Sequence, residues 1–91
     1  MYEIFVSSQF KKDIKSYRYT QKVISGTQSV IDSIRSKKLL PKKHNDHELK
    51  WTFSGVRECH IFPDVLLMYE IDKENNCLRL IRIGSHSEIF G

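Results

Sequence analysis

The sequence predicts an α+β domain in which two amphipathic helices pack on an antiparallel sheet. Apolar residues recur at helical spacing in the first half, at Phe10, Ile14 and Tyr17. The second half carries short runs of β-branched and aromatic residues, separated by turn residues. We therefore expect one domain over residues 1–91, with the order β-α-α-β-β-β and a helical hairpin covering the sheet.

The first half contains the predicted helices. Tyr2 to Val6 alternates as a strand does, and Ser7 or Ser8 can cap a helix that runs from Ser8 to about Arg18. A second helix is predicted from Gln21 to Ser36. Gly26 weakens it by ~1 kcal/mol relative to Ala. Its apolar stripe consists of Val23, Val30, Ile31 and Ile34.

The second half is predicted to form the sheet. Lys42 to Trp51 is polar and aperiodic, so we expect a surface loop there. Two strands follow, Val56 to Ile61 and Val65 to Ile71, and Phe62-Pro63-Asp64 is the turn between them. The remaining elements are a turn at Lys73-Glu74-Asn75-Asn76, a last strand from Cys77 to Ile83, and a tail containing His86.

Charge and composition limit the functions that are possible. Residues 1–50 hold 11 Lys and Arg against five Asp and Glu, whereas residues 51–91 hold four against six. Such asymmetry indicates a polyanionic partner, and nucleic acid is one. No apolar run approaches a membrane span, and the N-terminus does not resemble a signal peptide, so we expect a cytoplasmic protein without membrane contact. Cys59 and Cys77 are then reduced.

Four histidines, His44, His47, His60 and His86, supply groups that titrate near neutral pH. Together with Asp64 and two arginines, Arg57 and Arg82, they suit acid–base cleavage of a phosphodiester. Zinc binding is weakly supported, because the cysteines form no C-x-x-C pair and the histidine spacing is irregular. Nucleotide-binding and serine-hydrolase motifs are absent. We expect no metal and no cofactor.

Each of these residues also has an ordinary structural interpretation when it is taken singly. Asp64 after Pro63 is common turn chemistry, and a strand histidine such as His60 is more often hydrogen-bonded within the fold. Arg82 could form a salt bridge at a sheet edge, and His86 could be a tail residue. Only their convergence at one end of the sheet would indicate a site.

Four segments together resemble a known family. They are D-H-E-L-K (Asp46 to Lys50), R-E-C-H-I-F-P-D (Arg57 to Asp64), V-L-L-M-Y (Val65 to Tyr69) and R-I-G-S-H-S-E-I-F (Arg82 to Phe90). This combination resembles the YafQ branch of the RelE-type bacterial toxins, within the RelE/ParE superfamily. The resemblance implies a RelE-like fold and the toxin of a type II toxin–antitoxin pair. Such toxins are ribosome-dependent endoribonucleases, or mRNA interferases, that cut translated mRNA in the A site.

The resemblance also implies roles for residues. The catalytic histidines and acid fall on His47, His60, Asp64 and His86, and substrate-binding positions fall on Arg82 and Phe90. Arg57 is a further expected substrate-binding residue, because its guanidinium suits a phosphate. His86 is the expected general acid and Asp64 or His60 the base, while His47 supports the phosphate or shares proton transfer. His44 has no counterpart.

The implied partners are a cognate antitoxin, the ribosome and mRNA, with operator DNA bound only through the antitoxin complex. Ribosomal RNA would bind the helix lysines, an electrostatic contact that does not depend on sequence. These lysines are Lys11, Lys12, Lys15 and Lys22. The main alternative is a non-catalytic module that binds nucleic acid or the antitoxin.

Overall fold

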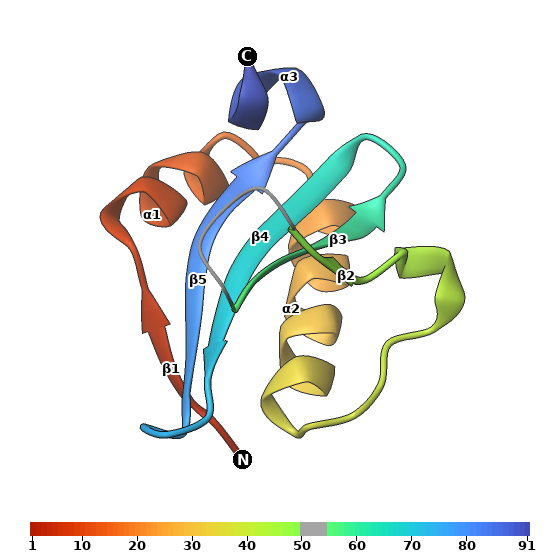
Figure 1. The fold of residues 1–91 in the computed structure, drawn as a ribbon. Coiled ribbons are helices and arrows are strands. Elements are labelled where there is room, and N and C mark those ends of the chain that lie inside the picture. The colour runs from red at the N-terminus through yellow and green to blue at the C-terminus, as the bar shows by residue number, and fades with distance from the viewer. Residues whose placement is uncertain (50–54) are drawn as a thin grey trace.

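A five-stranded sheet in the order β1-β5-β4-β3-β2 forms the centre of this computed structural model, which describes residues 1–49 and 55–91 (Figure 1). The strands are β1 (Glu3–Val6), β2 (His47–Glu48), β3 (Val56–Phe62), β4 (Val65–Asp72) and β5 (Cys77–Gly84). β3, β4 and β5 pair in an antiparallel manner, as expected. β2, which was not predicted, also pairs with β3 in an antiparallel manner. β1 joins β5 in parallel, so the sheet is mixed. The predicted α+β class is confirmed.

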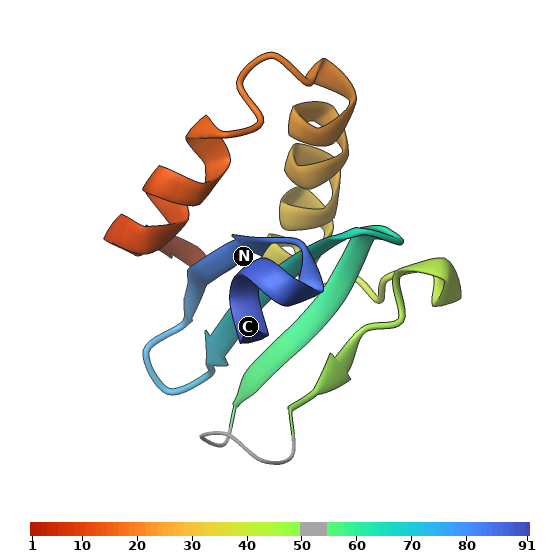
Figure 2. The same cartoon turned by 90° about the horizontal axis from the view of Figure 1, so that it is seen from above.

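Two helices, α1 (Ser8–Lys15) and α2 (Gln21–Arg35), lie on the same side of the sheet (Figure 2). The two helices cover different strands: α1 packs on β5, and α2 packs on β3. Ser7 caps α1 by accepting a hydrogen bond from the Phe10 amide at 2.9 Å. α1 ends before the predicted Arg18, because Ser16, Tyr17 and Arg18 donate their amides to carbonyls three residues back.

Gly26 lies where α2 closely approaches β3. A Cβ atom at this position would lie 3.2 Å from Cγ2 of Ile61 and 3.2 Å from the ring of Phe62. The glycine that weakens the helix locally therefore lets it pack closely on β3.

Two segments differ from the expected loop and tail. Residues 42–49 form a 3₁₀ turn, η1 (Lys42–His44), followed by β2, although the whole of 42–51 was predicted to be irregular; positions 50 and 51 lie outside the described residues. The predicted tail is wrong, since His86–Phe90 is a short helix, α3. Ser85 and Glu88 form a capping box at its start.

The core lies between the sheet and the two helices. β4 contributes Val65, Leu67 and Tyr69, which alternate with residues on the opposite face. The sheet also contributes Cys59 and Ile61 from β3, and Leu78, Leu80 and Ile83 from β5.

Within the part of the chain that the structure describes, no helix is long and apolar enough to cross a membrane.

Candidate active site

Glu58 and His60 share one face of β3, because alternate residues of a strand point the same way. The residues between and after them, Cys59 and Ile61, point into the core on the opposite face. Glu58 is only 7% exposed although it is charged. Burying a carboxylate costs free energy unless charged or polar groups lie beside it, so the residues around Glu58 are the next feature of the site.

His47 lies directly across from Glu58, because β2 pairs the two residues. Nε2 of His47 and Nε2 of His60 each lie 3.9 Å from the same Oε1 atom of Glu58. Nδ1 of His47 contacts the carbonyl oxygen of Asn45 at 2.7 Å. Since a carbonyl only accepts, Nδ1 must carry a proton, and Nε2 is left to face the carboxylate. One carboxylate thus stands between two imidazoles, an arrangement that can accept, hold and return a proton.

His44 contributes to the site through the backbone. Its Nδ1 contacts the carbonyl oxygen of His60 at 2.6 Å, so it joins η1 to the end of β3. The sequence offered no role for this histidine. The structure makes it a support for the strand that carries His60.

Asp64 lies in the exposed turn between β3 and β4. It borders a cavity of about 430 Å³ that Tyr17, Lys22 and Phe62 also line. The ammonium of Lys22 lies 5.1 Å from the centre of the Phe62 ring, a cation–π contact. Asp64 is therefore close to the start of α2.

His86 begins α3, and its ring lies 4.9 Å from the ring of Phe90. The pairings of His60 with Leu66 and of Leu66 with Gly84 form a row across three strands. At the usual strand spacing, about 10 Å separates the backbone of His60 from that of Gly84. His60, Asp64 and His86 thus share one end of the sheet. No hydrogen bond or ion pair within residues 1–49 and 55–91 joins Asp64 or His86 to His47 or His60.

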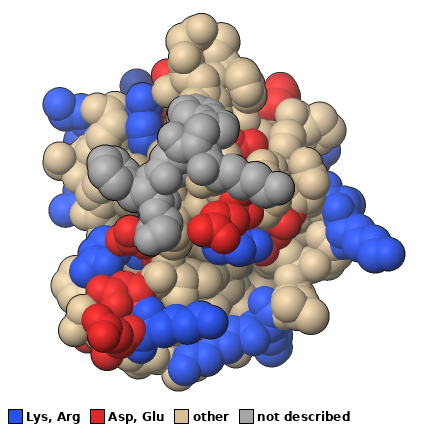
Figure 3. Space-filling model, in the orientation of Figure 1, with Lys and Arg blue, Asp and Glu red and all other residues tan. Residues whose placement is uncertain are grey.

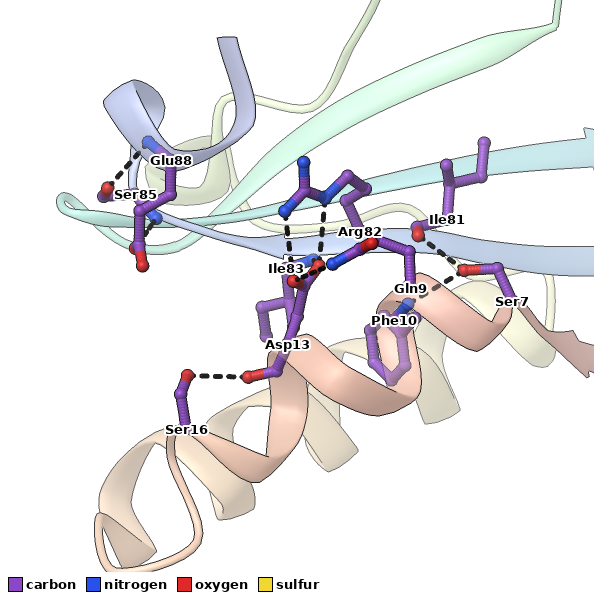
Figure 4. Close-up of polar contacts among 10 residues, drawn as sticks. All are labelled: Ser7, Gln9, Phe10, Asp13, Ser16, Ile81, Arg82, Ile83, Ser85 and Glu88. Atoms are coloured by element: carbon purple, nitrogen blue, oxygen red, sulfur yellow. Dashed lines mark hydrogen bonds and ion pairs between the residues drawn. The ribbon is translucent and has the colours of Figure 1, made fainter. Parts of the chain in front are cut away.

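Arg82 continues the row that starts at His47 and Glu58, with Met68 between Glu58 and Arg82. Its guanidinium binds Asp13 of α1, with Nε 3.0 Å from Oδ2 and Nη2 3.1 Å from Oδ1 (Figure 4). This bidentate contact raises the pKa of Arg82, so the residue stays cationic.

Arg57 lies on the opposite face from Glu58 and does not point toward the two imidazoles. It donates to Asp46, with Nη2 3.0 Å from Oδ2. Its Nε lies 3.4 Å from the hydroxyl of Tyr69, a core residue. The side chain that the sequence associated with the substrate is thus engaged in an internal network.

The predicted RNA-binding lysines lie at the surface. Lys11, Lys12 and Lys15 are exposed on α1, and Lys22 is exposed at the start of α2. Blue side chains gather over α1 at the left of Figure 3. They leave this end of the helical layer strongly basic.

Glu58 is the main residue that the sequence reasoning missed. The pattern R-E-C-H contained the signal, because alternation places Glu58 beside His60. Asp13 and Asp46 had no local signal, since their arginine partners are distant in sequence.

Cys59 does not supply a reactive thiol to this site. Burial raises the pKa of the Cys59 thiol to about 12, so it is not a nucleophile at neutral pH. Across residues 1–49 and 55–91, no group of three or more His, Cys, Asp or Glu side chains could hold a metal ion.

Comparison with known proteins identifies close relatives. Residues 2–91 match the family described as bacterial toxin of type II toxin–antitoxin system, YafQ. The mRNA interferase toxin YafQ of Escherichia coli (strain B / BL21-DE3) is 31% identical over 90 residues, which cover 98% of this chain and 96% of the relative. A metal-bound toxin from Helicobacter pylori has a similar crystal structure, with a TM-score of 0.92, 39% identity and coverage of 99% and 100%. The E. coli DinJ–YafQ complex gives a TM-score of 0.87 with 30% identity, and both chains are covered completely.

Proposed function

Since this chain belongs to the YafQ family of toxins of type II toxin–antitoxin systems, we propose that it is an endoribonuclease that cuts translated mRNA in the ribosomal A site. The reaction is attack of a ribose 2′-hydroxyl on the adjacent phosphorus, with departure of the 5′-oxygen. It uses the chain's own acid–base groups and no metal. The products are a 2′,3′-cyclic phosphate and a 5′-hydroxyl end.

The observation that carries this proposal is the carboxylate of Glu58 between His47 and His60, at 3.9 Å from each Nε2 atom. A base must take the proton of the 2′-hydroxyl, and an imidazole can do so near neutral pH. The imidazolium that forms is stabilised by an adjacent carboxylate. This arrangement favours His60 over Asp64 as the base, with His47 holding the phosphate or sharing the proton.

The departing 5′-oxygen needs a proton from an acid on the other side of the phosphate. His86 suits this role, because it is exposed at the start of α3, at the same end of the sheet as His60. Arg82 lies in the same row as Glu58 and would stabilise the charge that develops on the phosphate. Phe90, whose ring contacts His86, would pack near a base.

The partners follow from the same family. The E. coli YafQ forms a complex with DinJ, and we propose that a cognate antitoxin binds this chain likewise. The exposed lysines of α1 and the start of α2 would hold ribosomal RNA. Operator DNA would be bound only through the antitoxin complex. A protein that acts on these partners would work in the cytoplasm.

Mapping mRNA ends after induced expression tests the function. The wild type should produce new 5′ ends in translated messages by primer extension, and these ends should vanish with His86→Ala or His60→Ala. Asp32→Ala, which removes an exposed carboxylate from α2, is the matched control and should cleave as the wild type does. No new ends with the wild type would instead favour a non-catalytic binding module.

A further inference from the structure

We propose that Asp46, Arg57 and Tyr69 form a positioning network that holds His47 against Glu58. This inference rests on the proposed function and assigns Arg57 a role behind the active site instead of contact with substrate. Both oxygens of Asp46 accept from Arg57, at 3.0 Å from Nη2 and 3.4 Å from Nε. The hydroxyl of Tyr69 donates to Oδ1 of Asp46 and also lies 3.4 Å from Nε of Arg57. The three side chains therefore contact one another pairwise.

The network is anchored in the core. Tyr69 is 1% exposed, and its ring belongs to the main apolar cluster. A buried phenol is costly unless its hydroxyl has a partner, and here Asp46 accepts its proton. Burial, followed by the hydrogen bond to Asp46, raises the pKa of Tyr69, so it remains a donor at neutral pH. The buried side chain of Tyr69 thus connects β4 to Asp46, the residue immediately before β2.

β2 needs such an anchor, because it contains only two residues, His47 and Glu48, at the edge of the sheet. A strand this short has few backbone hydrogen bonds to fix its position. Asp46, immediately before it, is tied to β3 through Arg57 and to β4 through Tyr69. These side chains supply the fixation that the short backbone ladder lacks.

Each member of the candidate catalytic pair follows a network residue in the chain, and consecutive residues of a strand point to opposite faces of the sheet. Asp46 precedes His47, and Arg57 precedes Glu58, while His47 and Glu58 face each other across the ladder. A displacement of the Asp46–Arg57 contact would therefore move both members of the pair. A misplacement of about 1 Å can reduce a catalytic rate about 100-fold. The network on the opposite face thus controls the 3.9 Å distance between Nε2 of His47 and Oε1 of Glu58.

Arg57→Gln tests the proposal against a matched control, Arg79→Gln. Arg79 also pairs with carboxylates, Glu70 at 3.0 Å and Asp72 at 3.4 Å, but it lies away from the histidines. In ribosome-dependent cleavage, Arg57→Gln should lower kcat about 10- to 100-fold and leave KM within about twofold. Arg79→Gln should leave both within about twofold of the wild type.

Histidine ring resonances give a readout that a general loss of stability would not produce. In Arg57→Gln and Asp46→Asn, the ring signals of His47 should move while those of His86 stay in place, in variants whose circular dichroism matches the wild type. Tyr69→Phe, which keeps the buried ring and removes only the hydroxyl, should move the same signals. The control Arg79→Gln should move neither.

The outcomes separate this inference from the proposed function. A raised KM with unchanged kcat in Arg57→Gln would make Arg57 a substrate ligand and overturn the positioning role. Unmoved His47 signals would overturn it as well. If the wild type cleaves no RNA, the proposed function fails, and the His47 signals still decide whether the network positions the ring.

Discussion

The carboxylate of Asp13 holds the guanidinium of Arg82 in a bidentate contact at 3.0 and 3.1 Å (Figure 4). The same carboxylate accepts from the amide of Ile83 at 3.2 Å and from Nε2 of Gln9 at 3.0 Å. β1 pairs with β5 only as far as Leu80. Beyond that point, Asp13 accepts the hydrogen bond of the Ile83 amide in place of a neighbouring strand. α1 is thereby fastened to the strand that leads to His86.

Asp13→Asn should lower the free energy of unfolding by about 1.5–3 kcal/mol, because the carboxylate is 10% exposed and bonds a charged partner. Urea denaturation measures this loss. Asp32→Asn is the control, since that carboxylate accepts an exposed hydrogen bond from Gln28 of the same helix. Equal losses in the two variants would contradict the structural role of Asp13.

Lowering the pH should remove the contribution of Asp13 to the free energy of unfolding. Burial opposes ionisation of this carboxyl, but hydrogen bonds from Arg82, Gln9 and Ile83 outweigh it and lower its pKa. A lowered folded-state pKa contributes stability that is complete above the unfolded pKa of about 3.9 and is lost as pH falls through the folded value. The difference in unfolding free energy between wild type and Asp13→Asn should therefore be largest near pH 7 and shrink below about pH 4. A difference that does not decrease as the pH falls below about 4 would refute this assignment.

Glu58→Gln should reduce cleavage about 100- to 10,000-fold while the fold is retained, because the amide has the same shape but cannot stabilise an imidazolium. Single-turnover cleavage of ribosome-bound message measures the effect. Glu74→Gln, in the exposed turn between β4 and β5, should cleave normally. Full activity in Glu58→Gln would remove the carboxylate from the mechanism.

Reversing the charge of Lys11, Lys12 and Lys15 to Glu should abolish co-sedimentation with ribosomes without changing thermal stability. Each of these lysines is exposed on α1, so its contribution to folding is small. The wild type should bind with a steep dependence on salt, and variants with fewer of these lysines should show a shallower slope. Reversal of Lys37 and Lys38, which follow α2, provides the control. Unchanged co-sedimentation of the α1 variant would exclude this helix as the ribosome contact.

Much of the fold could be predicted because its signals are local. Helical spacing of Phe10, Ile14 and Tyr17 predicted α1, and the apolar run from Val65 predicted β4. The resemblance to the YafQ family, read from four short segments, is confirmed. The helix at His86 could also have been found, because Ser85 and Glu88 have the spacing of a capping box.

The remainder depends on contacts between distant residues. β2 has no pattern of its own and exists only because His47 and Glu48 pair with Glu58 and Arg57. A salt bridge of Arg82 could be expected from the sequence, but not its partner, because Asp13 lies 69 positions away and meets Arg82 only when α1 packs on β5. Glu58 was overlooked because a charged strand residue is usually solvated, and its burial appears only when β2 and β4 flank it.

Cleavage of a defined message by the purified protein tests the central claim most directly. The RNA would be supplied either free or placed in the A site of programmed ribosomes, and the new ends would be identified by mass spectrometry. We expect cleavage only on the ribosome, with 2′,3′-cyclic phosphate and 5′-hydroxyl ends, insensitive to 1,10-phenanthroline and abolished by His86→Ala. Intact message on the ribosome, or cleavage that the chelator prevents, would contradict a ribosome-dependent nuclease that uses its own acid–base groups.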